Sequence, residues 1–187
     1  MGGGLLPVAL HKGELYFLFG FENNEDSTPN LLADFGGGKN NNETQFQTAI
    51  REGCEELNGF FGNITSLRKR VKRNNILKIQ HKSYLTCVFL TDYDKNLPNY
   101  FNNNFNFLQR KLPHIIKDTE NGLLEKQRIQ WLNTRELKTR TDFRPFYKGI
   151  VDKLIAKLPK IKENVLKKRK LNQTMKHKKS NNKTRKN

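Results

Sequence analysis

The sequence has few of the residues that build disulfide frameworks or zinc sites. Its 187 residues include only two cysteines, Cys54 and Cys87, too few for a disulfide framework or a cysteine-rich zinc site. The four histidines are scattered and do not have the spacing of metal ligands. Catalysis by a cysteine and histidine pair or by zinc therefore has little support. We expect both cysteines to be reduced and structural.

Long apolar runs are also missing. No stretch approaches the ~18 apolar residues of a transmembrane helix, and the glycine-rich start lacks the basic region and apolar segment of a signal peptide. We therefore expect an intracellular protein without a membrane segment. The chain is of single-domain length, and its thirteen phenylalanines can supply a substantial core.

Acidic residues are scarce relative to basic ones, and the excess is uneven. The chain has 35 lysine and arginine residues against 18 acidic ones, a net charge of +17. Residues 160–187 contain twelve of the basic residues and one glutamate, with few apolar side chains after residue 166. We expect a folded domain over 1–159 and a largely disordered tail over 160–187. Such a tail suits RNA or another polyanion, an import signal, or a solubilising role without a specific partner.

A second basic run occupies residues 68–73. It either lines the approach to an active site, where it would bind the phosphates of a long substrate, or forms an exposed loop. The candidate nucleic-acid-binding residues lie in this run and in the tail: Arg68, Lys69, Arg70, Lys72, Arg73, Lys167, Lys168, Arg169 and Lys170.

An acidic cluster on a predicted helix over 43–57 is the most informative local feature. Glu52, Glu55 and Glu56 are three and four residues apart, so a helix places them on one face. Like charges at this spacing destabilise a helix by about 0.2–0.5 kcal/mol per pair. A solvated face neutralised by Lys or Arg is one interpretation. The other is a site for Mg²⁺ or Mn²⁺, which prefer oxygen ligands.

The flanks of this helix fit the second interpretation. The apolar run 31–35 predicts a strand, and the glycines at 36–38 predict a loop in which backbone approaches a metal or phosphate closely. Glu43 or Thr44 can begin the helix. Arg51 lies beside the carboxylates, where its guanidinium can hold one of them. Asn58 is suited to a left-handed position just after the helix.

The spacing of these residues resembles the signature of the Nudix hydrolases, G-x5-E-x7-R-E-U-x-E-E-x-G-U, where U is a bulky aliphatic residue. All charged positions are filled. The departures are Gly53 at an aliphatic position, Asn58 at a glycine and Gly59 at the last apolar position. The resemblance implies metal ligation by Gly37, Glu52, Glu55 and Glu56, catalysis by Glu55 and Glu56, and supporting roles for Glu43 and Arg51.

The resemblance extends to a late acidic residue. Glu125 precedes the apolar segment 129–132, which contains Trp131, as in relatives where a glutamate in this region is a metal ligand or general base. We assign Glu125 this catalytic role, with Glu120 as its rival. The alternative is a surface carboxylate paired with Lys126 or Arg128.

The predicted order of elements matches the fold that the resemblance implies. A hairpin with a turn at 12–13 is followed by the strand over 31–35, the acidic helix, strands over 76–80 and 82–91, and a helix or inserted loop over 99–112. A strand over 127–132, a short helix over 134–138 and a closing helix over 143–158 complete the chain. We expect an α/β/α sandwich with a mixed sheet.

The family resemblance implies a metal-dependent hydrolase of a diphosphate linked to another group. The basic excess favours capped RNA as the partner and release of methylated guanosine diphosphate. The segment 143–150 resembles the mRNA-decapping Nudix enzymes of large DNA viruses, and so does the composition, which is rich in asparagine (23 residues) and lysine (24 residues). This resemblance would place the protein in the host cytoplasm. Hydrolysis of diphosphoinositol polyphosphates or nucleotide derivatives is the alternative, and a non-catalytic RNA-binding protein is the third possibility.

Overall fold

The chain forms one mixed sheet with helices on both faces. The computed structural model describes residues 1–22, 31–117 and 124–184, except for the side chains of 117 and 176–184. The sheet has the path β3-β2-β1-β6-β5, with β4 also paired to β1 and β7 to β2. β1 and β6 are parallel and the other pairs are antiparallel. The strands are β1 (Gly2–His11), β2 (Glu14–Glu22), β3 (Leu32–Ala33), β4 (Phe35–Gly38), β5 (Asn75–His81), β6 (Tyr84–Leu90) and β7 (Lys126–Asn133).

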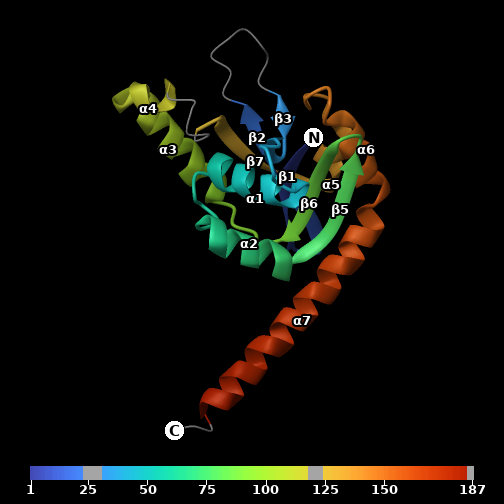
Figure 1. The fold of residues 1–187 in the computed structure, drawn as a ribbon. Helices are drawn as coiled ribbons and strands as arrows, with labels where there is room; N and C mark the ends of the chain where they lie inside the picture. Colours follow the sequence, from blue (N-terminus) through green and yellow to red (C-terminus); the bar gives the residue numbers. More distant parts are fainter. Residues whose placement is uncertain (23–30, 118–123, 185–187) are drawn as a thin grey trace.

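Helices cover both faces of the sheet (Figure 1). An apolar core lies between the sheet and each layer of helices. One face packs against α1 (Gln45–Glu56), α2 (Ile64–Arg73) and α3 (Leu97–Lys111), and α4 (Pro113–Lys117) follows α3. The other face packs against α5 (Thr134–Thr139), α6 (Lys148–Ala156) and the start of α7 (Leu158–Thr184). The α/β/α sandwich with a mixed sheet that the sequence predicts is confirmed.

The predicted hairpin joins β1 and β2. Val8 pairs with Phe17 and His11 pairs with Glu14, and the two turn residues Lys12 and Gly13 have φ values of 47° and 81°. Positive φ at both central positions is typical of the tight turn whose twist matches that of the strands.

The glycines at 36–38 form a strand and not the predicted loop. β4 pairs with the first half of β1, so that Gly3 lies opposite Gly37 and Gly4 opposite Gly36. A Cβ on Gly36 would lie 2.3 Å from the Cα of Gly4 and 2.2 Å from the hydroxyl of Tyr84. Glycine is therefore needed here for close packing between neighbouring strands, and none of the three has a positive φ.

The tail contains a long helix where disorder is predicted. α7 continues to Thr184 and extends away from the sheet (Figure 1). Its first turns pack on the sheet because Ile161 and Val165 are fully buried, and the amide Nδ2 of Asn164 donates to the carbonyl of Ile76 at 3.0 Å. The basic composition concealed these two apolar anchors at i and i+4. No helix in the described part of the chain is both long and apolar enough to cross a membrane.

Candidate active site

Arg51 is the centre of the acidic cluster on α1. The helix begins with a capping box in which Thr44 and Gln47 satisfy each other's backbone amides, as the predicted start requires. Arg51 then contacts three carboxylates. Its Nε atom lies 2.9 Å from Glu43 Oε1, its Nη2 atom 2.9 Å from Glu52 Oε1, and its Nη1 atom 3.0 Å from Glu55 Oε2. The predicted supporting position of Arg51 beside Glu43 and the acidic face is therefore present, and its hydrogen bonds to Glu43 lower the pKa of that carboxyl.

Gly37 lies directly against the carboxylate of Glu52. A Cβ on Gly37 would be 2.6 Å from the carboxyl carbon of Glu52 and 2.6 and 2.7 Å from its oxygens. Glycine at this point of β4 therefore lets the Glu52 carboxylate approach the backbone. Burial raises the pKa of Glu52, the contact with Arg51 opposes this change, and the charges of Glu55 and Glu125 add to it.

Glu56 occupies a different environment at the end of the same helix. It is 2% exposed, and its Oε1 atom lies 3.1 Å from the Nζ atom of the fully buried Lys126. The same ammonium contacts Glu22 at the end of β2, and Arg144 Nη1 reaches Glu22 Oε1 at 3.0 Å. Burial alone would lower the pKa of Lys126, but the carboxylates of Glu56 and Glu22 outweigh it and raise that pKa. Burial raises the pKa of Glu56 well above its ordinary range.

Glu125 stands at the edge of this cluster, immediately before β7. Its side chain is half-buried, and burial raises its pKa; Lys126 opposes the rise, while the charges of Glu22 and Glu55 reinforce it. A carboxyl with a raised pKa beside other carboxylates has the properties of a general base. Its role stays a prediction. Its rival, Glu120, lies outside the described residues.

Asn58 connects the end of α1 to the start of β7. It has a left-handed φ of 48°, as predicted for the residue after the helix, and Gly59 follows with a φ of 72°. The side-chain oxygen of Asn58 accepts a hydrogen bond from the backbone N–H of Leu124 at 3.0 Å. Asn58 therefore adopts the left-handed conformation for which glycine is usual after a helix. Its side chain also binds the backbone of Leu124, the residue before Glu125.

Gly53 is explained by its neighbour on β1. A Cβ at this position would lie 2.5 Å from the Cδ1 atom of Leu5 and 2.7 Å from its Cγ atom. Leu5 thus fills the volume that an aliphatic side chain at position 53 would occupy. The departure from the signature is a change in packing between α1 and β1 and leaves the acidic face in place.

The donor atoms of the acidic cluster are of the kind that a hard divalent cation prefers. All its donors are oxygens, and the buried Oε2 atom of Glu56 has no hydrogen-bond partner among the described residues. Within those residues, no three carboxylate, histidine or cysteine side chains converge closely enough to hold an ion. Glu52 and Glu55 instead pair with Arg51, whereas Glu56 pairs with Lys126. Joint metal binding by Gly37, Glu52, Glu55 and Glu56 stays a prediction.

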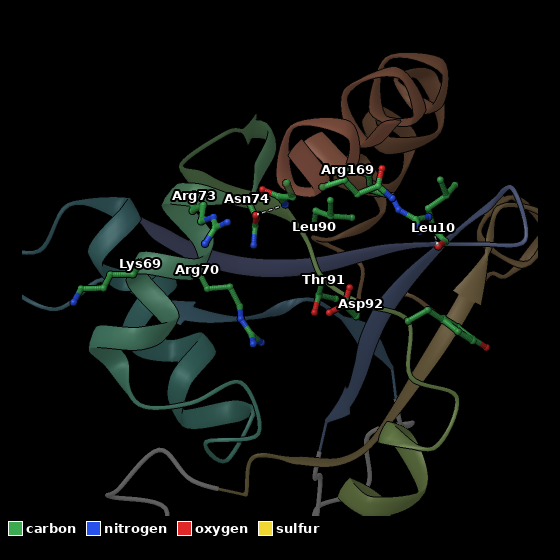
Figure 2. A pocket seen from close by; sticks show the side chains of 12 residues that line it. Leu10, Lys69, Arg70, Arg73, Asn74, Leu90, Thr91, Asp92 and Arg169 are labelled. Carbon is green, nitrogen blue, oxygen red and sulfur yellow. Dashed lines mark hydrogen bonds between the residues drawn. The ribbon is translucent and has the colours of Figure 1, made fainter. Parts of the chain in front are cut away.

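The basic residues singled out in the sequence separate into two groups. Residues 64–73 form the helix α2 and not a loop, because Leu67 and Val71 are buried and Asn63 caps the helix. Lys69, Arg70 and Arg73 line a cavity together with Arg169 of α7 (Figure 2). The other candidates do not line this cavity: Arg68, Lys72, Lys167, Lys168 and Lys170. Of these, Lys167 forms an ion pair with Glu163.

Sequence reasoning missed Glu22, Arg144 and the buried state of Lys126. Glu22 and Lys126 are isolated charges at the ends of apolar strands, and Arg144 lies between α5 and α6; most such charges are exposed. It also missed Asp34, whose carboxylate is fully buried and accepts hydrogen bonds from the hydroxyls of Tyr84 at 2.9 Å and Thr86 at 2.8 Å. Burial raises the pKa of Asp34 to about 6, although these two hydrogen bonds oppose the shift.

Similar folds occur among solved structures, at low identity. The Caenorhabditis elegans Ap4A hydrolase binary complex is 16% identical with a TM-score of 0.49, over 84% of this chain and 96% of that one. The Nudix hydrolase RenU of M. smegmatis is 12% identical with a TM-score of 0.46, over 82% of each chain. The NUDIX domain of Shewanella oneidensis NrtR with ADP ribose is 9% identical with a TM-score of 0.44, over 84% and 86%.

No protein-family model and no curated protein matches the chain. The TM-scores of the solved structures are all below 0.5 and therefore do not by themselves place the chain in a family.

Proposed function

We propose that the protein is a Nudix-type hydrolase that uses Mg²⁺ or Mn²⁺ to cleave a diphosphate linked to another group. One observation carries the proposal: Arg51 gathers Glu43, Glu52 and Glu55 on one side of α1, next to the half-buried Glu125. A solvated acidic face needs no such arrangement, nor a glycine that lets the Glu52 carboxylate touch the backbone.

The residues divide the work as follows. Glu52, Glu55 and Glu56, with the backbone of Gly37, would hold the metal. When bound, the metal supplies charge neutralisation for the phosphate oxygens and makes water more acidic. Glu125 accepts the proton of the attacking water, for which its raised pKa is suited. Arg51 keeps Glu52 and Glu55 oriented, and Glu43 in turn fixes the guanidinium.

The substrate that we propose is capped RNA, with release of methylated guanosine diphosphate. The net charge of +17 supports a polyanionic substrate, and the sequence resemblance to decapping enzymes of large DNA viruses adds to it, with the host cytoplasm as the site of action. Hydrolysis of diphosphoinositol polyphosphates or of free nucleotide diphosphate derivatives is the alternative that the same charge allows.

A comparison of substrates tests this choice. The purified full chain is given cap-labelled RNA, a free dinucleotide cap analogue and a diphosphoinositol polyphosphate, each with Mg²⁺, with Mn²⁺ and with EDTA. Decapping predicts metal-dependent release of methylated guanosine diphosphate from RNA at the highest kcat/KM. Cleavage of the small substrates alone would reject decapping and leave the hydrolase in place.

Variants of the acidic face test the hydrolase itself. Glu52→Gln and Glu55→Gln should each reduce kcat by at least about 100-fold, the size of effect seen when one group that stabilises charge in the transition state is removed. Asp152→Asn, on the exposed side of α6, is the matched control and should retain full turnover. Near-wild-type turnover of both glutamine variants would contradict the proposal. Metal-independent RNA binding without turnover by the wild type would favour a binding protein.

A further inference from the structure

A basic cavity lies at the end of the sheet opposite the acidic cluster. It has a volume of about 520 Å³ and is bordered by α2, the segment after β6 and α7 (Figure 2). Leu10, near the end of β1, lines it, whereas Gly3, opposite Gly37, lies seven residues earlier in the same strand. At about 3.3 Å per residue, the two sites are separated by about 23 Å along β1.

Three of the cavity's four cations come from one face of α2. Lys69 and Arg73 are four residues apart and Arg70 and Arg73 are three apart, so the helix presents them together. The guanidinium of Arg70 also lies over the ring of Phe61, 5.5 Å from its centroid. This contact holds Arg70 without neutralising its charge.

The fourth cation comes from α7, in a segment for which the sequence predicts disorder. Arg169 Nη1 donates to the carbonyl oxygen of Leu10 at 3.0 Å, and the Nδ2 atom of Asn172 donates to Asn74 Oδ1 at 3.2 Å. These contacts fix α7 against the end of β1 and against the end of α2. The second wall of the cavity therefore depends on the docked helix.

The charges in the cavity are not balanced by the protein. Among the described residues, neither Lys69, Arg70, Arg73 nor Arg169 forms an ion pair. Asp92 is the acidic residue among those that line the cavity. Four cations and one carboxylate therefore line the cavity, and a bound polyanion would offset the excess positive charge.

An aromatic side chain completes the wall. Tyr93 lines the cavity and is half-exposed. It is held by stacking on His11, with ring centroids 4.5 Å apart and planes at 23°, and by tilted contacts with Tyr16 at 4.7 Å and Trp131 at 5.4 Å. A rigid aromatic surface next to unpaired cations is the combination with which proteins bind single-stranded nucleic acid.

We propose that this cavity binds single-stranded RNA, with Lys69, Arg70, Arg73 and Arg169 on the phosphodiester backbone and Tyr93 stacked on a base. The inference rests on the proposed function in that the 5′ end of the same RNA would reach the acidic cluster. The separation of about 23 Å requires a substrate several nucleotides long, within the ~4–16 nucleotides that single-strand-binding sites cover. A small polyphosphate would not span it.

Binding of an uncapped RNA tests the cavity without any hydrolysis. A fluorescein-labelled single strand of twelve nucleotides is titrated with the full chain in EDTA, and anisotropy gives the Kd at several salt concentrations. Arg70→Gln/Arg73→Gln should raise the Kd at least tenfold. It should also reduce the slope of log Kd against log salt by about 1.4, because each phosphate contact on a single strand contributes about 0.7. Arg169→Gln should reduce the slope by about half as much.

The matched control lies on the same helix. Arg68→Gln/Lys72→Gln removes the same charge from α2 outside the cavity and should change the Kd less than threefold. An equal loss of RNA affinity in the two double variants would overturn the proposal. So would an unchanged Kd in both Arg70→Gln/Arg73→Gln and Arg169→Gln. Tyr93→Leu should raise the Kd about tenfold if a base stacks there; circular dichroism confirms that each variant is folded.

Two further measurements separate this inference from the proposed function. Inositol hexakisphosphate is titrated alone; tight binding of it together with no binding of RNA would overturn the RNA assignment in favour of a small polyphosphate. Hydrolysis of the free dinucleotide cap by the wild type is measured in parallel. Hydrolysis without RNA binding rejects the cavity and retains the enzyme, whereas RNA binding at the cavity without hydrolysis does the reverse.

Discussion

The Nζ atom of Lys126 lies 3.1 Å from the Oε1 atom of Glu56, and both side chains are almost completely excluded from solvent. The same ammonium contacts Glu22, so that one buried cation serves two carboxylates from different elements. It thereby ties the end of α1 to β2 and β7. Removing the cation would leave two carboxylates with less compensation in an environment that already disfavours their charge.

Lys126→Met should therefore destabilise the protein by about 3–5 kcal/mol, the cost of breaking a buried ion pair from one side. In Lys126→Met/Glu56→Gln the losses should be less than additive by at least about 1 kcal/mol, because the partners act on each other. Unfolding in urea, followed by circular dichroism, measures both effects. Lys138→Met, an exposed lysine of α5, should stay within about 0.5 kcal/mol of the wild type. Strict additivity would show that the contact has no energetic weight.

Gly37 and Gly38 offer a matched pair at the proposed metal site. Gly37→Ala places a methyl group 2.6 Å from the Glu52 carboxyl carbon, whereas a Cβ on Gly38 would meet nothing within 4 Å. Since the group that must move is the flexible end of Glu52, stability should change by less than about 1 kcal/mol. Mn²⁺ affinity, measured by calorimetry, and kcat should each fall at least about tenfold, the scale for disturbing a ligand's surroundings. Gly38→Ala should retain the wild-type Mn²⁺ affinity and kcat. Equal losses of affinity and kcat in the two variants would contradict a special role for Gly37.

The sequence predicted best where local chemistry decides the structure. The hairpin turn at Lys12 and Gly13 and the left-handed Asn58 follow from residue type and spacing. The errors arose where tertiary partners decide. The glycines at 36–38 join a strand because a second glycine run lies opposite them in β1, which no local rule reveals.

Charged segments were the other source of error. An exposed loop was one of the two interpretations of the basic run at 68–73, and disorder was expected over 160–187. Two apolar residues one turn apart nevertheless anchor a helix in each segment: Leu67 with Val71, and Ile161 with Val165. The burial of Lys126 was also hidden, because lysine is almost never fully buried unless it is paired. Its partners, Glu22 and Glu56, are far away in the sequence.

The contact between Leu5 and Gly53 gives a prediction in which one substitution changes sign. In the wild-type background, Gly53→Ala should destabilise the protein by about 1–3 kcal/mol, because its methyl group would overlap Leu5. In a Leu5→Ala background the same substitution should be stabilising by up to about 1 kcal/mol, since alanine is the better helix former and the space is then open. Urea unfolding of the four proteins checks this. A destabilising Gly53→Ala in both backgrounds would show that Leu5 is not the obstacle.

Asp34 should make the stability of the fold depend on pH. Its pKa rises from 3.8 to about 6 in the folded protein because burial penalises the charged carboxylate. Between these two values the folded state binds the proton more tightly than the unfolded chain, so the free energy of unfolding falls as pH rises through this window and levels off above about 6. The full difference corresponds to about 3 kcal/mol.

Asp34→Asn removes this titration while keeping the size and an oxygen acceptor for Tyr84 or Thr86. The free energy of unfolding of the wild type minus that of the variant should therefore decrease by up to about 3 kcal/mol as the pH is raised across the window. Taking the difference cancels the contributions of other carboxyls whose pKa is shifted by folding, such as Glu125, whose pKa is raised by burial. Asp152→Asn, which removes an exposed carboxylate of α6, should give a difference that stays nearly constant. A constant difference for Asp34→Asn as well would mean that the Asp34 carboxyl is ionised throughout, with Tyr84, Thr86 and the nearby Lys126 stabilising the charge more strongly than burial opposes it.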